Sequence, residues 1–242
     1  MSKKASGLET AVSKKVGRAI FDYRMVADGD KILVAVSGGK DSLVLLKILS
    51  DRRSFVPIKY DLVAVHVDFQ GGRHGVDRSL LKEHLKRQGV PFYFKKAKLR
   101  KGKGRENRSC FWCAWNRRKV LFELAAKYAC NKLALGHHKD DIIETILMNL
   151  FFEGEISAMV PRQKMFEGKV TIIRPLAYVE KCDITKLAQR LDLPVAICRC
   201  PQSQTSNRRR MADLIQELEK KCPGVKTNIF RSLQRIKKDY LL

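Results

Sequence analysis

Short apolar runs alternate along the chain with longer segments in which apolar residues recur every three or four positions. The runs at 32–36, 60–69, 91–99 and 133–137 are typical of buried strands. Helical spacing is found at 9–26, 43–49, 76–89, 113–129 and 139–152. A further short strand is expected within 170–179, followed by a helix, a cysteine-rich loop and a basic helical tail. This alternation predicts an α/β fold with a mostly parallel sheet flanked by helices.

The predicted elements form one domain with additions at both ends. The 242 residues, 45% of them hydrophobic, suffice for a single α/β core. We divide the chain into an N-terminal helical extension (1–27), a central domain (28–180) and a C-terminal region (181–242) that holds a cysteine-containing loop and basic helices.

The turn after the first predicted strand carries the most informative chemistry. Residues 37–42 read Ser-Gly-Gly-Lys-Asp-Ser and lead into a helix. Glycine permits left-handed dihedrals, so backbone N–H groups can approach an anion at the positive end of that helix. An ordinary tight turn is the alternative, but two serine hydroxyls and a mobile lysine favour a phosphate-binding loop. The predicted nucleotide-binding residues here are Ala35, Val36, Ser37, Gly38, Gly39, Lys40, Asp41 and Ser42.

Two more segments lie where parallel strands are expected to end. In doubly wound sheets, ligands bind outside the carboxyl ends of the strands. His66, Val67 and Asp68 end the second strand, and Gly136 and His137 end the fourth, so we add these residues to the nucleotide site. The next helix starts with paired carboxylates, which are either N-capping groups or, beside a triphosphate, oxygen ligands for Mg²⁺. We assign Asp41 and Asp141 to Mg²⁺.

Charge changes the picture by indicating a polyanionic partner. Forty-nine Lys and Arg against 25 Asp and Glu give a formal net charge of +24. Nucleic acid neutralises such an excess and gains affinity through counterion release. An anionic membrane surface is the alternative, but no basic amphipathic helix with bulky aromatic anchors is evident. The basic clusters, which we expect to converge on one face, lie at 95–108, 117–119, 208–210 and 231–238.

The cysteines indicate a metal or redox site. No apolar run reaches the length of a bilayer and the N-terminus lacks the apolar core of a signal peptide, so we expect a cytoplasmic protein with no membrane partner. In that compartment seven cysteines favour metal ligands or reactive thiols over disulfides. Cys110 and Cys113 form a CxxC pair before a predicted helix, and Cys198 and Cys200 form a distant CxC. A redox dithiol, a zinc site and an iron–sulfur cluster with one open iron all remain open.

The phosphate-loop motif resembles that of a known enzyme class. SGGKDS is similar to the signature of the PP-loop pyrophosphatases, which cleave ATP between the α and β phosphates and adenylate a carbonyl. Further segments resemble the tRNA 2-thiocytidine synthetase family in order and spacing, over residues 30–235. They are CFWCAWNRRKVLF, LALGHHKDDIIETILMNLFF, IIRPLAYV and CRCPQSQTSNRRRMADLI. The resemblance implies an adenine nucleotide alpha hydrolase-like fold.

That resemblance also implies the cofactors and the chemistry. Cys110, Cys113 and Cys198 would hold a 4Fe-4S cluster, with Cys200 as the alternative third ligand because CRCPQSQ departs from the usual CxxC-Gly-Ser-Gln. ATP and Mg²⁺ would adenylate an anticodon-loop cytidine of tRNA, and sulfur would then replace its 2-oxo group. The catalytic residues would be Lys40, Asp41, Asp141 and Arg117; the last, one turn beyond Cys113, would steady the intermediate unless it is a surface cation.

Other functions share parts of this pattern. A 2-thiouridine-forming tRNA thiolase would use similar residues. A PP-loop ligase would share 37–42 without needing the cysteines, and a noncatalytic RNA-binding metal protein would need only the charge. For the thiolase we expect sulfur from a cysteine desulfurase or free sulfide, and a homodimer is left open.

Overall fold

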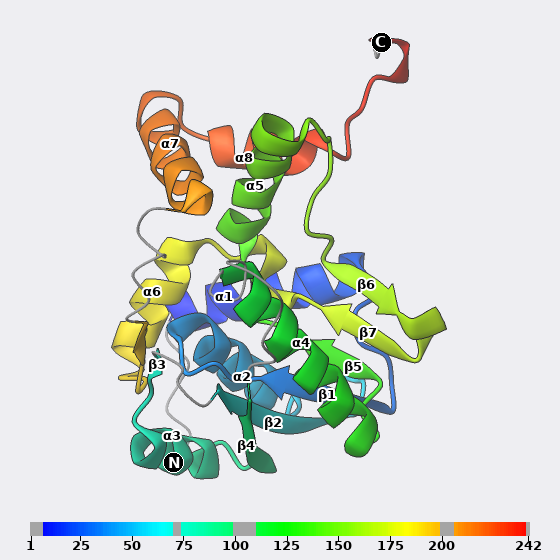
Figure 1. Cartoon of the computed structure of the whole chain (residues 1–242), viewed down its shortest axis with the longest axis vertical. Helices are drawn as coiled ribbons and strands as arrows, with labels where there is room; N and C mark the ends of the chain where they lie inside the picture. The colour runs from blue at the N-terminus through cyan, green and yellow to red at the C-terminus, as the bar shows by residue number, and fades with distance from the viewer. Residues whose placement is uncertain (1–6, 70–73, 99–109, 199–205, 241–242) are drawn as a thin grey trace.

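The computed structural model describes residues 7–69, 74–98, 110–198 and 206–240. Among these residues a six-stranded sheet runs in the order β4-β2-β1-β5-β7-β6, and a two-residue ladder joins β3 to β8 (Figure 1). The first five strands of the large sheet are parallel and β6 is antiparallel to β7. The strands are β1 (Asp30–Ala35), β2 (Tyr60–Phe69), β3 (His74–Gly75), β4 (Phe92–Ala97), β5 (Lys132–Ala134), β6 (Arg162–Met165), β7 (Val170–Ile173) and β8 (Ile197–Cys198).

Helices cover both faces of this sheet. Buried side chains of α1, α2, α3 and α6 pack on one face, and α4 packs on the other (Figure 1). The α-helices are α1 (Gly7–Asp22), α2 (Lys40–Arg52), α3 (Arg78–Arg87), α4 (Cys110–Lys127), α5 (Lys139–Met148), α6 (Lys181–Arg190), α7 (Asn207–Lys221) and α8 (Val225–Ser232). Short 3-10 turns occupy Phe166–Gly168, Pro175–Tyr178 and Lys238–Tyr240. The predicted α/β class and mostly parallel sheet are confirmed.

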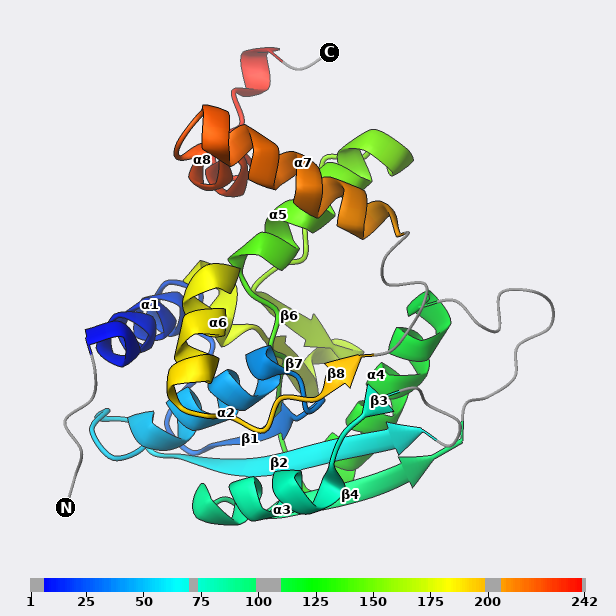
Figure 2. The same ribbon diagram turned by 90° about the vertical axis from the view of Figure 1, so that its left-hand side faces the viewer.

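Helix α5 leaves the sheet and forms a separate layer with α7 and α8, above the sheet in Figure 2. Ile143 and Leu147 on α5 are buried against Met211 and Ile215 of α7. The apolar face of α5 therefore packs on the C-terminal helices, whereas its first turn lies beside the carboxyl end of β5.

Several boundaries differ from the sequence prediction. Helix α4 begins at Cys110, so the CxxC pair lies within its first turn and not before it. The helix predicted to 152 ends at Met148 and continues as a π-helical turn, Asn149–Glu153. Strands β3, β6 and β8 were not predicted. None of the described helices combines the length and hydropathy that a bilayer crossing requires.

Candidate active site

The phosphate loop lies where the strand order reverses. Strand β1 has β2 on one side and β5 on the other, so its carboxyl end is the switch point at which doubly wound sheets bind ligands. Gly38 has φ +86°, and an added Cβ there would lie 2.8 Å from Val76 Cγ2. The Ser42 hydroxyl donates to the Gly39 carbonyl oxygen at 2.8 Å and accepts the Ser37 N–H at 3.1 Å. These bonds fix a tight loop whose next residue, Lys40, starts α2.

His138 joins the two carboxylates assigned to Mg²⁺. The Asp141 N–H donates to His138 Nδ1 (3.3 Å), while the His138 N–H donates to Asp141 Oδ2 (3.0 Å), a capping box at the start of α5. With Nδ1 accepting, a neutral imidazole carries its proton on Nε2, which lies 3.8 Å from Asp41 Oδ1. Lys40 Nζ lies 2.6 Å from the same Asp41 oxygen. Both carboxylates thus flank one buried histidine.

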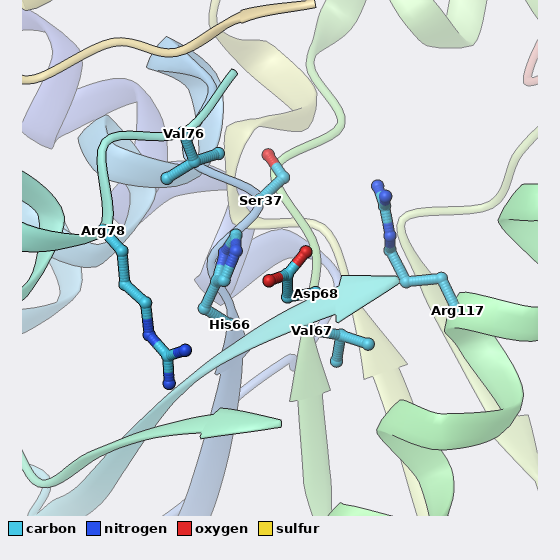
Figure 3. A pocket seen from close by; sticks show the side chains of 7 residues that line it. All are labelled: Ser37, His66, Val67, Asp68, Val76, Arg78 and Arg117. Carbon is cyan, nitrogen blue, oxygen red and sulfur yellow. The ribbon is translucent and has the colours of Figure 1, made fainter. Parts of the chain in front are cut away.

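A small cavity of about 60 Å³ opens beside the loop. It is lined by Ser37, His66, Val67, Asp68, Val76, Arg78 and Arg117 (Figure 3). His66 Nδ1 lies 2.8 Å from the Val36 carbonyl oxygen and donates to it. Burial lowers the pKa of His66, so the ring is neutral near pH 7. Figure 3 shows the Asp68 carboxylate pointing toward Ser37. The cavity therefore combines hydrogen-bonding groups with two cationic arginines.

His137 follows β5 and has a buried ring nitrogen. Burial lowers the pKa of His137 to about 4, so its imidazole is neutral. Its Nδ1 is buried and makes no hydrogen bond among the residues that the structure describes. Buried polar atoms are normally satisfied, so an orphaned nitrogen at the end of β5 fits a bound nucleotide or base.

The other carboxylates of α5 are held by the C-terminal helices. Lys226 Nζ donates to Asp140 Oδ1 (2.8 Å) and, against the effect of burial, keeps the pKa of Asp140 below its usual value. Burial, reinforced by the Asp141 charge, raises the pKa of Glu144 to about 7. Arg208 Nη1 lies 3.1 Å from Asp141 Oδ1 and 3.6 Å from Glu144. Arg208 therefore contacts the predicted magnesium ligand itself, and the RNA-binding role of the basic run 208–210 stays a prediction.

The cysteines predicted to hold the iron–sulfur cluster come from two separate elements, α4 and β8. Cys113 is a half-buried free thiol, and Cys110 precedes it by one helical turn, the spacing that puts two residues on one helix face. Cys198 ends the two-residue strand β8 and pairs in register with His74, while Cys200 lies outside the described residues. The Ala196 N–H donates to the Gly38 carbonyl oxygen at 2.9 Å, so the segment leading to Cys198 is attached to the phosphate loop.

The magnesium assignment relies on phosphate oxygens and water as well as on the two aspartates. Across the described ranges no three His, Cys, Asp or Glu side chains form a metal-binding group. Mg²⁺ commonly takes one or two carboxylates and completes its shell with phosphate oxygens and water. Asp41 and Asp141 fit that donor set, and their role stays a prediction.

Sequence reasoning missed three contributors. Arg78 and Val76 reach the cavity from the start of α3, and no local motif marks them. His138 stands within the GHHKDD segment expected at the end of the fourth strand, but the sequence alone assigns it no role. Only the packing of β5 against the phosphate loop shows why this histidine matters.

Gly136, which follows β5, lies against the backbone at the start of α2. An added Cβ would lie 3.0 Å from Ser42 N and 3.1 Å from the Asp41 carbonyl carbon, which are backbone atoms that cannot rotate away. We expect Gly136→Ala to destabilise the fold by about 1–3 kcal/mol and to weaken ATP binding, because the start of α2 must shift. Thermal unfolding and equilibrium ATP binding measure both effects. Gly7→Ala is the matched control, since nothing lies within 4 Å of its Cβ; equal effects of both substitutions would contradict the expectation.

Comparison with known proteins agrees with this geometry. Residues 8–218 match the family model described as the PP-loop domain. The chain is 43% identical to the tRNA-cytidine(32) 2-sulfurtransferase of Geobacter sulfurreducens over 96% of this chain and 91% of that protein. It is 38% identical to the enzyme of the same name from Paracidovorax citrulli, over 100% and 79% of the two chains.

A solved structure is similar as well. The U34-tRNA thiolase NcsA from Methanococcus maripaludis, solved with its 4Fe-4S cluster, superposes with a TM-score of 0.73 and 25% identity. The match covers 94% of this chain and 78% of that one. The fold, the phosphate loop and the extent of these similarities lead to one conclusion: the chain belongs to the PP-loop family and, within it, to the tRNA-cytidine(32) 2-sulfurtransferases.

Proposed function

We propose that this ATP-dependent tRNA thiolase converts cytidine 32 of the tRNA anticodon loop to 2-thiocytidine. The observation that carries the proposal is the phosphate loop at the sheet's switch point, bonded through Gly38 to the segment that leads to Cys198. Relatives at about 40% identity bear that activity in their names. A 4Fe-4S cluster held by Cys110, Cys113 and Cys198 would supply an open iron that carries sulfide.

The residues around the loop support the first step. The loop backbone and Lys40 would bind the phosphates of ATP, and Asp41 and Asp141 would hold Mg²⁺, which neutralises charge on the departing pyrophosphate. The cytidine O2 attacks the α-phosphorus, the bond to the β-phosphate breaks, and pyrophosphate leaves. Arg78 and Arg117, which border the cavity, lie where they can balance negative charge on the adenylated base.

Sulfur then replaces the activated oxygen. Sulfide attacks C2 of the ring, the C2–O bond breaks, and AMP leaves with the former O2 while a proton is released to solvent. The target base must be unpaired to expose its O2 and C2 atoms, which a loop nucleotide permits. The three-segment division at 27 and 180, the cytoplasmic location, the desulfurase or sulfide donor and the homodimer remain predictions.

Nucleoside analysis tests the proposal. Anaerobically prepared protein with ATP, Mg²⁺, sulfide and tRNA should yield 2-thiocytidine by mass spectrometry, together with AMP and pyrophosphate. A tRNA with uridine at position 32 should yield none. Appearance of 2-thiouridine would assign the chain to the uridine-modifying alternative, and release of ADP would contradict the adenylation step.

A further inference from the structure

Both tryptophans of the chain form one stacked pair in the first turns of α4. Trp112 and Trp115 have ring centroids 5.1 Å apart and planes 9° apart. The sequence contains no other tryptophan. Trp115 is 42% exposed, which is a large apolar surface to leave in water. A pre-stacked, half-exposed indole is the kind of surface on which a nucleobase stacks.

The pair lies beside the candidate site but does not form part of its cavity. Cys113 stands between the two tryptophans in sequence, and Arg117, two residues beyond Trp115, lines the cavity. Along the same helix Leu121 and Leu124 are buried against the sheet, so α4 is anchored by its other face. A helix with side chains is about 10–12 Å across, which places Trp115 within about one helix width of Arg117.

Cations accompany the exposed ring. Lys119 Nζ lies 5.9 Å from the Trp115 centroid, near the outer limit of a cation–π contact, so it is loosely held. Arg118 is exposed next to it. A base arriving on the ring would displace the Lys119 ammonium toward its own phosphate. Aromatic surface with neighbouring cations, on a chain of net charge +24, fits single-stranded RNA.

We propose that Trp115 is a stacking site for an unpaired base of the anticodon loop, adjacent to the base that is thiolated. The inference rests on the proposed tRNA function and adds a contact that positions the loop. Stacking on an aromatic side chain is sequence-tolerant, so this site holds the loop and does not read its sequence.

A second stacked aromatic pair, between β4 and the residue that follows α4, provides a matched control. Tyr93 and Tyr128 have centroids 4.3 Å apart and planes 13° apart, and Tyr93 is also 42% exposed. Tyr128 follows the last residue of α4, whereas the tryptophans lie in its first turns. Tyr93 belongs to edge strand β4, where it pairs with Val65 of β2, so a whole strand separates it from β1 and the phosphate loop. Exposure and stacking are thus alike, and only the position differs.

Intrinsic fluorescence tests the site directly because both tryptophans report from it. Titration of wild-type protein with an anticodon stem-loop should quench the emission. Trp115→Ala should weaken stem-loop binding between about fivefold and a hundredfold and raise KM for tRNA, with kcat little changed. Trp115→Phe should restore most of the affinity, and Tyr93→Ala should bind as wild type does. Thermal unfolding verifies that each variant is folded.

The outcomes separate the two proposals. If wild-type protein thiolates tRNA but shows no quenching, and Trp115→Ala binds the stem-loop normally, the stacking site is wrong and the proposed function stands. If wild-type protein neither binds nor thiolates tRNA, the proposed function itself fails. Loss of binding to a sulfur-donating protein, with RNA affinity unchanged, would make the pair a protein contact and would also overturn the inference.

Discussion

Replacing Asp141 with asparagine is expected to abolish most tRNA thiolation while leaving the fold and the iron content unchanged. Asparagine keeps an oxygen that can accept the His138 N–H, so the capping box survives. It removes the negative charge that would hold Mg²⁺ against the triphosphate and that now pairs with Arg208. Loss of one such electrostatic group lowers kcat by a factor of about 10²–10³. The rate of AMP and pyrophosphate release per enzyme molecule measures this effect.

Asp213→Asn is the appropriate control for that substitution. Asp213 is an exposed carboxylate on α7 that pairs with Arg209. Its replacement by asparagine therefore makes the same chemical change away from the site. Its turnover should stay within about twofold of wild type, since surface ion pairs contribute little. An Asp141→Asn enzyme with normal turnover would contradict the magnesium role, and loss of iron would show that the nucleotide and cysteine sites are not separable.

Replacing Cys113 with serine is expected to strip iron from anaerobically reconstituted protein and to eliminate thiolation. Thiolates bind iron–sulfur clusters far better than hydroxyls do. Changes to groups that merely support a ligand already cost about 10–100-fold in metal affinity, so loss of a direct ligand should cost at least as much. Iron and sulfide assays, with the visible absorption of the cluster, measure the effect.

The remaining cysteines make this experiment specific. The Cys222→Ser variant should retain iron, because Cys222 is exposed at the end of α7 and is not among the predicted cluster ligands. Cys198→Ser should lose iron and Cys200→Ser should retain it; the opposite result would transfer the third ligand to Cys200. Full iron in Cys113→Ser, or stoichiometric zinc in the wild-type protein, would refute the cluster.

The sequence predicted those parts of the fold that depend on local periodicity. Strand β2 begins and ends at the predicted residues, because its ten residues are rich in β-branched and aromatic side chains and polar residues flank them in the sequence. Two-residue strands carry no such signal: β3 and β8 exist because His74 and Cys198, 124 residues apart, meet in the folded chain. The early end of α1 at Asp22 also depends on tertiary structure, since Met25 is buried and Arg24 adopts a left-handed φ of 47°.

The sequence predicted those parts of the candidate site that consist of short local motifs. The phosphate loop and the strand ends lie together, as the carboxyl ends of neighbouring parallel strands must. The partners of the α5 carboxylates could not be deduced, because Arg208 and Lys226 come from helices 67 and 86 residues beyond Asp141 and Asp140. Long-range ion pairs leave no local sequence pattern, so the contact between Arg208 and Asp141, the predicted magnesium ligand, could not be deduced.

The hydrogen bond from Ala196 to Gly38 couples the conformation of the phosphate loop to that of the segment leading to Cys198. Whatever stabilises the nucleotide-bound loop also favours the position of the segment that ends at Cys198, and coupling between binding equilibria is reciprocal. A substitution in the segment before Cys198 would then weaken nucleotide binding, and a substitution in the phosphate loop would weaken retention of the proposed cluster. Genetic or kinetic phenotypes alone would assign such variants to the wrong cofactor.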